Sequence, residues 1–180
     1  MSNQKVFDES AFEADSAKEN RKVKDSVLLF MARYLLSLEV FGMNITYQEV
    51  ISVEDYNILR EAVGWGSLCD EQAQQGLDHS AYVIGCYDND KIVGTARIIW
   101  DKGYISYLAD VMVMPEYQRM GIGRHMVEMA IAFMKSQVKE GWKIKMVLIA
   151  AKGKEAFYSR FGFQERPNRD AGAGMDMWLT

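Results

Sequence analysis

Two glycines and two arginines near the middle of the chain have the spacing of an anion-binding loop. The segment Gln118–Arg124 reads QRMGIGR, and apolar residues recur at helical spacing directly after it. The first amides of a helix have no intrahelical partner and lie at the positive end of its dipole, so a loop there can hold a diphosphate. Gly121 and Gly123 lack the Cβ atoms that would block close approach. Arg119 and Arg124 can add countercharge.

The same residues permit other interpretations of this loop. A Gly-x-Gly pair at a helix start also serves tight turning, so the motif alone leaves that alternative open. The nucleotide-binding motif GxxxxGK[ST] is absent from the sequence, and so is the dinucleotide fingerprint GxGxxG. ATP or NAD binding therefore has no motif to support it.

The residues on both sides of the loop predict the elements that position it. Alternating apolar residues between turn residues mark three strands, which should form an antiparallel meander. These strands are predicted over Ala81–Tyr87, Lys91–Trp100 and Tyr104–Met114. Pro115 ends the third strand, and the apolar periodicity then predicts a helix from Ile122 to Val138.

Shorter elements complete the predicted order. Upstream, we expect a strand from Ile45 and helices over Glu54–Val63 and Asp70–Gly76; downstream, a strand over Lys145–Ala151, a helix over Lys154–Arg160 and a last strand over Met175–Leu179. The run from Lys145 to Ala151 is apolar enough to be buried on both faces, which suits a strand beside a crossover helix.

The N-terminal part of the chain is predicted to lie outside this domain. Residues 1–25 mix charges of both signs with few apolar anchors, which is typical of a mobile segment. Residues 26–41 have apolar positions at helical spacing, with Ser26 as the N-cap and Gly42 as the stop. A chain of 180 residues has room for one core, so we expect an extension over 1–43 and a single domain over 44–180.

The loop and its surroundings resemble the GNAT acetyltransferase superfamily. The superfamily signature Gln/Arg-x-x-Gly-x-Gly/Ala is matched by Gln118, Gly121 and Gly123. The resemblance covers roughly Ile45–Leu179 and includes the strand before the loop and the segment FYSRFGF after the next strand. It implies an α/β (α+β) fold with a mixed, mostly antiparallel central sheet of about six to seven strands. Helices would flank the sheet, which would be splayed between the fourth and fifth strands.

The same resemblance implies that acetyl-coenzyme A is the cosubstrate. Its pantetheine arm would lie along the main chain of Val111, Met112 and Val113. Its pyrophosphate would be held by the loop residues Gln118, Arg119, Met120, Gly121, Ile122, Gly123 and Arg124. Phe157, on the helix after the splayed strand, would lie beside the pantetheine.

Acetyl transfer to an amine needs a neutral amine, an oxyanion stabiliser and a proton for the leaving thiolate. By resemblance Tyr158 is the general acid, because a phenol with a pKa of about 10 stays protonated at neutral pH. A tyrosine packed at a helix edge is the structural alternative. The main-chain amide of Val113 would meet the oxyanion.

The general base is not evident. Family members often carry His or Glu at the positions that here hold Tyr107 and Ala109. Asp110 is the candidate base or substrate anchor; strict alternation points it to the opposite face of the sheet, but a bulge could re-aim it. A structural hydrogen-bonding role for Asp110 and deprotonation through a water chain stay open. Trp65 and Tyr107 are the candidate acceptor-binding residues.

Composition excludes several classes of partner. A net charge of -4 with interspersed signs gives no footprint for nucleic acid, and charges interrupt the most apolar stretch, so no membrane span is expected. Two scattered histidines and two isolated cysteines predict no metal site and fit a reducing compartment. No signal-peptide pattern opens the chain, so a cytoplasmic location is expected.

The leading hypothesis is therefore an N-acetyltransferase that acts on a primary amine of a small molecule by direct attack in a ternary complex. Two alternatives stay open: a protein or peptide N-acetyltransferase, and a non-catalytic coenzyme A-binding regulatory module. A homodimer is expected, through the apolar face of the 26–41 helix or through the last strand. The acceptor's identity and the range of acyl groups do not follow from the sequence.

Overall fold

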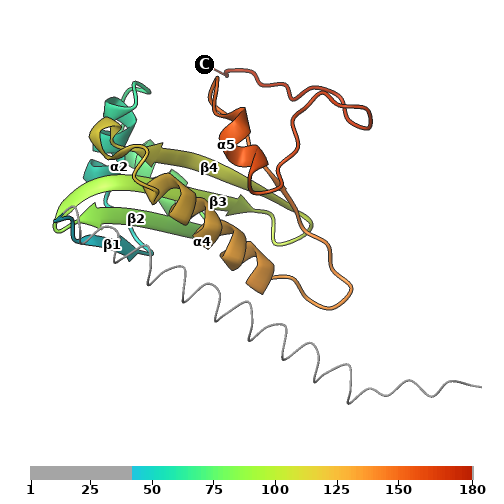
Figure 1. Cartoon of the computed structure of the whole chain (residues 1–180), viewed down its shortest axis with the longest axis horizontal. Helices are drawn as coiled ribbons and strands as arrows, with labels where there is room; N and C mark the ends of the chain where they lie inside the picture. The colour runs from blue at the N-terminus through green and yellow to red at the C-terminus, as the bar shows by residue number, and fades with distance from the viewer. Residues whose placement is uncertain (1–41, 180) are drawn as a thin grey trace, which may run out of the picture. The chain divides into compact units, whose positions relative to one another are not determined.

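The structure is a computed structural model that describes residues 42–179. They form one five-stranded sheet in the order β1-β2-β3-β4-β5. Figure 1 labels the first four of these strands. The strands are β1 (Ile45–Gln48), β2 (Tyr82–Asp88), β3 (Lys91–Trp100), β4 (Ile105–Val113) and β5 (Lys145–Val147). β2, β3 and β4 are antiparallel, and β5 lies parallel to β4. The predicted mixed sheet and its antiparallel meander are confirmed.

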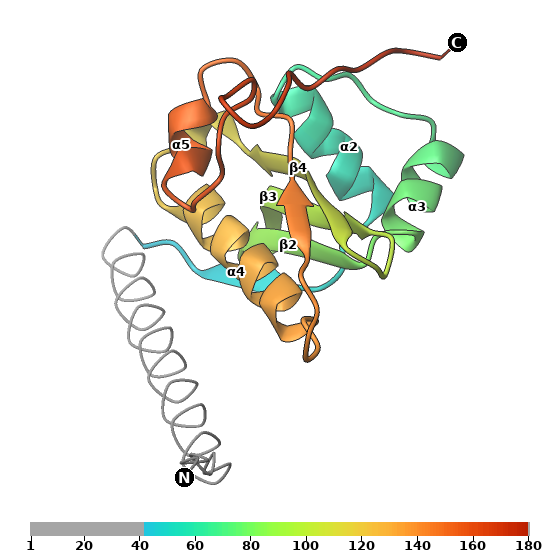
Figure 2. The ribbon, with the colours of Figure 1, turned by 90° about the vertical axis from the view of Figure 1, so that its right-hand side faces the viewer.

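Helices cover both faces of the sheet. They are α2 (Val53–Ala62), α3 (Asp70–Asp78), α4 (Ile122–Ser136) and α5 (Glu155–Ser159), with a short 3-10 turn η1 (Pro115–Tyr117) before α4. α4 packs on β2, β3 and β4 from one side, whereas α2 contacts β3 and β4 from the other side (Figure 2). Because β3 is covered on both faces, its residues from Ile92 to Ala96 are all buried.

The local sequence explains where the main elements begin and turn. Ser52 caps α2 by accepting a hydrogen bond from the amide of Asp55 at 3.0 Å. The two hairpins need a left-handed residue each, and Asn89 (φ 53°) and Lys102 (φ 62°) supply them. In the second hairpin Asp101 Oδ1 accepts from the amide of Gly103 at 2.7 Å. These turns fix the length of β3.

Two predictions at the C-terminal end are wrong. The strand expected over Lys145–Ala151 stops at Val147, and the strand expected over Met175–Leu179 does not form. Within residues 42–179 the sheet therefore has five strands rather than six or seven. The side chain of Trp178 is 91% exposed, so the tail gains neither a ladder partner nor apolar burial from the described residues. The helix predicted over residues 26–41 lies outside the described part of the chain.

None of the helices within residues 42–179 is long and apolar enough to cross a bilayer.

Two buried hydroxyls on neighbouring strands make a matched test of polar burial. Ser106 in β4 is 1% exposed and its Oγ has no hydrogen-bond partner among the described residues. Thr95 in β3 is equally buried, but its Oγ1 donates to the carbonyl of Ile84 at 2.8 Å. We expect Ser106→Ala to raise the free energy of unfolding by about 1 kcal/mol and Thr95→Val to lower it by about 1 kcal/mol. Urea unfolding measures both changes in the free energy of unfolding. Changes of the same sign in the two variants would contradict the hydrogen-bond assignment.

Candidate functional site

β4 and β5 separate within the sheet and leave an open edge on β4. Their pairing runs from Ile105 opposite Lys145 to Tyr107 opposite Val147, where β5 ends. β4 continues to Val113. The amide of Met114 donates to Val93 of β3 at 2.8 Å, so alternation turns the N–H of Val113 away from β3 and toward the open edge. The splay expected between the fourth and fifth strands is confirmed.

A bulge interrupts β4 beside this open edge. Ala109 lies opposite Arg97, but Met112 lies opposite Thr95, so β4 has one residue more than β3 between these two pairs. Asp110 lies in this interval with a φ of 50°, in the left-handed region. The bulge that the sequence analysis allowed as an alternative is present. It changes the direction in which the following residues of β4 point.

Asp110 is held by two donors on one oxygen. Its Oδ2 accepts a hydrogen bond from Tyr56 Oη at 2.6 Å and forms an ion pair with Arg97 Nε. Burial raises the pKa of Tyr56, and the Asp110 carboxylate adds to the rise, so this phenol remains a donor. The structural alternative for Asp110 is therefore realised in its contacts.

The loop before α4 places free helix amides next to the open edge. Gly121 is the N-cap of α4 with a φ of 90°, and the first intrahelical bond runs from His125 N to Gly121 O at 3.0 Å. The amides of Ile122 and Gly123 precede that bond. A Cβ built on Gly123 would lie 3.5 Å from Val113 Cγ2 and 3.8 Å from Phe157, so loop, strand end and α5 converge here.

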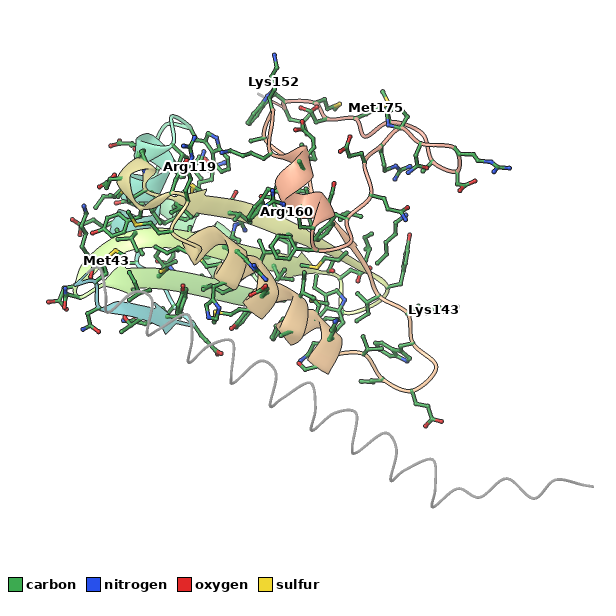
Figure 3. All side chains as sticks on the ribbon, viewed as in Figure 1. Met43, Arg119, Lys143, Lys152, Arg160 and Met175 are labelled. Atoms are coloured by element: carbon green, nitrogen blue, oxygen red, sulfur yellow. The ribbon has the colours of Figure 1, made fainter. Side chains whose placement is uncertain are left out.

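The predicted loop residues differ in what their side chains do. Gln118 Nε2 donates to the carbonyl of Val113 at 3.1 Å, which ties the loop to the strand. Arg124 pairs with Glu128 at 2.9 Å, one turn further along α4. The side chains of Arg119 and Met120 are exposed on the loop before α4, where Figure 3 labels Arg119. Among the described residues, Arg119 thus remains the loop cation without an ion pair.

Tyr158 lies on α5 within a cluster of aromatic rings. Its ring centroid is 5.0 Å from that of Phe157 and 6.1 Å from that of Phe163. Burial raises the pKa of Tyr158 to about 12, and the neighbouring phenol of Tyr107 contributes to the rise. Tyr107 forms the last pair between β4 and β5, so the phenol that contributes to this rise lies at the point of separation.

Comparison with known proteins identifies this arrangement. The model of the acetyltransferase (GNAT) domain family matches residues 79–165, which span β2 through α5. A Streptococcus pneumoniae acetyltransferase of the GNAT family is 28% identical, with a TM-score of 0.61 over 77% of this chain and 98% of its own. Together these matches support an assignment to the GNAT acetyltransferase superfamily.

Further relatives agree with this GNAT assignment. A protein of meticillin-resistant Staphylococcus aureus, described as a probable acetyltransferase, is 28% identical; the match covers 76% of this chain and 99% of that one, with a TM-score of 0.66. The uncharacterized N-acetyltransferase ycf52 of Pyropia yezoensis is 24% identical over 166 residues, which cover 90% of each chain.

On the α2 side of the GNAT sheet, Trp65 lies at the end of a row of contacts that begins at Asp110. Tyr56 bonds to Asp110, and the guanidinium of Arg60 lies 5.7 Å from the Tyr56 ring centroid. The same guanidinium lies 5.8 Å from the ring of Trp65, whose side chain is 45% exposed. The structure thus connects Trp65 to Asp110 through Arg60 and Tyr56.

Arg97 and Tyr56 contact the candidate site residue Asp110, and the sequence did not indicate either of them. Arg97 lies between the buried residues Ala96 and Ile98 of β3, and its side chain is only 17% exposed. A charge inside a buried strand requires a partner, and this requirement was the signal in the sequence that could have indicated Arg97.

Among residues 42–179 there is no group of three or more His, Cys, Asp or Glu side chains that could hold a metal ion.

Proposed function

We propose that this GNAT enzyme transfers the acetyl group of acetyl-coenzyme A to a primary amine of a small molecule, by direct attack in a ternary complex. The supporting observation is that α5, which carries Tyr158 and Phe157, meets the start of α4 and the end of β4, where Phe157 lies 3.8 Å from a Cβ built on Gly123. Acetyl-coenzyme A supplies an acyl group on a thiolate leaving group.

The residues that converge at the open edge fit this cosubstrate. The amides of Ile122 and Gly123 at the start of α4 would bind the pyrophosphate, and Arg119 would add countercharge. The main chain from Val111 to Val113, which lies beyond the last pair with β5, would bond to the pantetheine arm as an added strand does. Phe157 would close one side, because its ring lies 3.8 Å from the place that a Cβ on Gly123 would take.

Two groups would perform the chemistry. The N–H of Val113 would stabilise the negative charge that develops on the acetyl oxygen, since it faces the open edge. Tyr158 Oη would give its proton to the departing sulfur, because a phenol with a pKa of about 12 carries that proton at neutral pH.

The proton of the acceptor amine would pass to water. Tyr56 and Arg97 both donate to Oδ2 of Asp110. The ion pair with Arg97 favours a structural role for this carboxylate over the role of a general base. Tyr107 and Ala109 occupy the positions where a His or Glu was expected from the resemblance. Trp65 and Tyr107 remain the proposed acceptor-binding side chains, on the α2–α3 loop and at the separation of β4 and β5.

Titration calorimetry with acetyl-coenzyme A tests the proposal, with ATP and NAD as controls. We expect micromolar binding of acetyl-coenzyme A and about 100-fold weaker binding of the controls, because no nucleotide motif is present. A panel of small amines, assayed for thiol release, then tests turnover. Binding without turnover over the whole panel would favour the non-catalytic module instead, an alternative that the vacant base positions support.

The cellular location, the partners and the oligomeric state of the enzyme are also proposals. We infer a cytoplasmic protein without nucleic-acid or membrane partners, supported by the free cysteines Cys69 and Cys86 and the net charge of -4. A homodimer is supported by the exposed apolar side chains of the C-terminal segment, of which Figure 3 labels Met175. Sedimentation velocity of the full chain tests the dimer.

A further inference from the structure

We infer that Arg97 is a positioning residue whose ion pair with Asp110 holds the β4 bulge, and thereby sets which main-chain amides face the cosubstrate. The inference rests on the proposed function of the open edge. It concerns how the edge is built, so the two can fail separately.

The bulge decides the direction of the amides that follow it. β4 has one residue more than β3 between the pairs Ala109–Arg97 and Met112–Thr95. A shift of one residue exchanges the two edges of a strand as well as its two faces. Without the bulge, the amide that now points from Val113 to the open edge would point toward β3. The cosubstrate-binding main chain therefore depends on this one irregularity.

The bulge requires a backbone conformation that must be held. Asp110 has a φ of 50°, a region in which a side chain with a Cβ is disfavoured, although Asp tolerates it better than most residues. Its side chain is 15% exposed and accepts from both Arg97 and Tyr56. These two donors fix the carboxylate on the α2 side of the sheet, and with it the left-handed backbone.

Arg97 is itself anchored to another element. Its Nη1 donates to the carbonyl of Gly76 in α3 at 3.0 Å and to Ser80 Oγ at 3.2 Å. Burial alone would lower the pKa of Arg97, but the adjacent Asp110 raises it overall, so the guanidinium stays charged. The negative end of the α3 dipole also favours a cation at this place. The guanidinium thus links the last turn of α3 to the bulge.

The first test removes the charge of Arg97. In the full chain, Arg97→Gln should raise the Kd for acetyl-coenzyme A about 10-fold, and Arg97→Lys should recover part of the loss, because Lys keeps the charge but not the fork of donors. Lys91→Gln is the matched control: Lys91 lies on the same strand, and its pair with Glu116 at 2.9 Å is exposed. If the Kd of Arg97→Gln, like that of Lys91→Gln, equals the Kd of the wild type, the inference is overturned.

The second test acts on the backbone and stays informative if Arg97→Gln does not fold. Asp110→Gly permits a φ of 50° without a partner, whereas Asp110→Val opposes it. We expect Asp110→Val to bind acetyl-coenzyme A about 10-fold more weakly than Asp110→Gly does. Equal losses in the two variants would mean that the carboxylate, and not the bulge, matters for binding.

Amide hydrogen exchange separates this inference from the proposed function. The peptide that covers Val111–Val113 should exchange faster in Arg97→Gln and in Asp110→Val than in the wild type, with no ligand present. If the wild type does not bind acetyl-coenzyme A, the proposed function fails while exchange still decides the role of Arg97. Unchanged exchange in both variants would refute that role.

Discussion

Replacing Tyr158 with phenylalanine is expected to lower kcat by about 100- to 1000-fold while leaving the Kd for acetyl-coenzyme A within about twofold of the wild type. The ring keeps its contacts with Phe157 and Phe163, so the packing of α5 is preserved. Only the hydroxyl is lost, and with it the proton for the departing sulfur. The interaction is needed in the transition state, which is why the loss should fall on kcat rather than on binding.

Thiol release under saturating cosubstrate measures this loss, and calorimetry measures the affinity. Tyr104→Phe is the matched control, because Tyr104 is 66% exposed in the β3–β4 hairpin. Its kcat should stay within about twofold of the wild type. If Tyr158→Phe keeps full turnover with a measured acceptor, the acid role is untenable.

The pH profile of the wild type gives an independent check. The folded-state pKa of Tyr158 is raised to about 12, so the phenol keeps its proton well above neutral pH and loses it only as the pH rises through that value. We expect kcat to increase as the amine deprotonates and then to stay level up to about pH 10. A fall in kcat between about pH 8 and pH 10 would show that the acid has an ordinary pKa near the reference of about 10 or below.

Local signals in the sequence were sufficient to predict an element wherever turn residues and apolar periodicity occur together. β3 forms over the predicted residues Lys91–Trp100, because turns that contain the left-handed Asn89 and Lys102 bound it on both sides. The start of α4 follows in the same way from Gly121 and the apolar periodicity that begins at Ile122. In each case the information lies within a few residues of the element.

Features that depend on distant partners could not be predicted. The segment Met175–Leu179 has an apolar composition, but a strand needs a neighbouring edge, and nothing near it in the sequence specifies one. The bulge at Asp110 depends on Arg97 and Tyr56, which lie 13 and 54 residues away in the chain. The sequence therefore allowed a bulge at Asp110 but could not show whether one forms. The identity of the acceptor is beyond reach for the same reason, since loops line its site.

Gly121→Val is expected to raise the Kd for acetyl-coenzyme A about 100-fold or more, because the N-cap of α4 cannot keep its conformation. Gly121 has a φ of 90°, and a β-branched residue at positive φ is a genuine outlier. The backbone would shift at the residue that directly precedes the amides of Ile122 and Gly123. Those amides would then turn away from the position in which they meet the pyrophosphate.

A second glycine separates this local effect from a general loss of stability. Gly141 follows α4 with a φ of 74°, is exposed, and has no atom within 4 Å of an added Cβ. Gly141→Val therefore imposes similar backbone strain far from the loop, and both variants should lose about 1 to 2 kcal/mol of unfolding free energy. Only Gly121→Val should lose affinity in calorimetry. Equal affinities in the two variants would mean that the Gly-x-Gly pair serves a turn and not a phosphate, and the cosubstrate site would have to lie elsewhere.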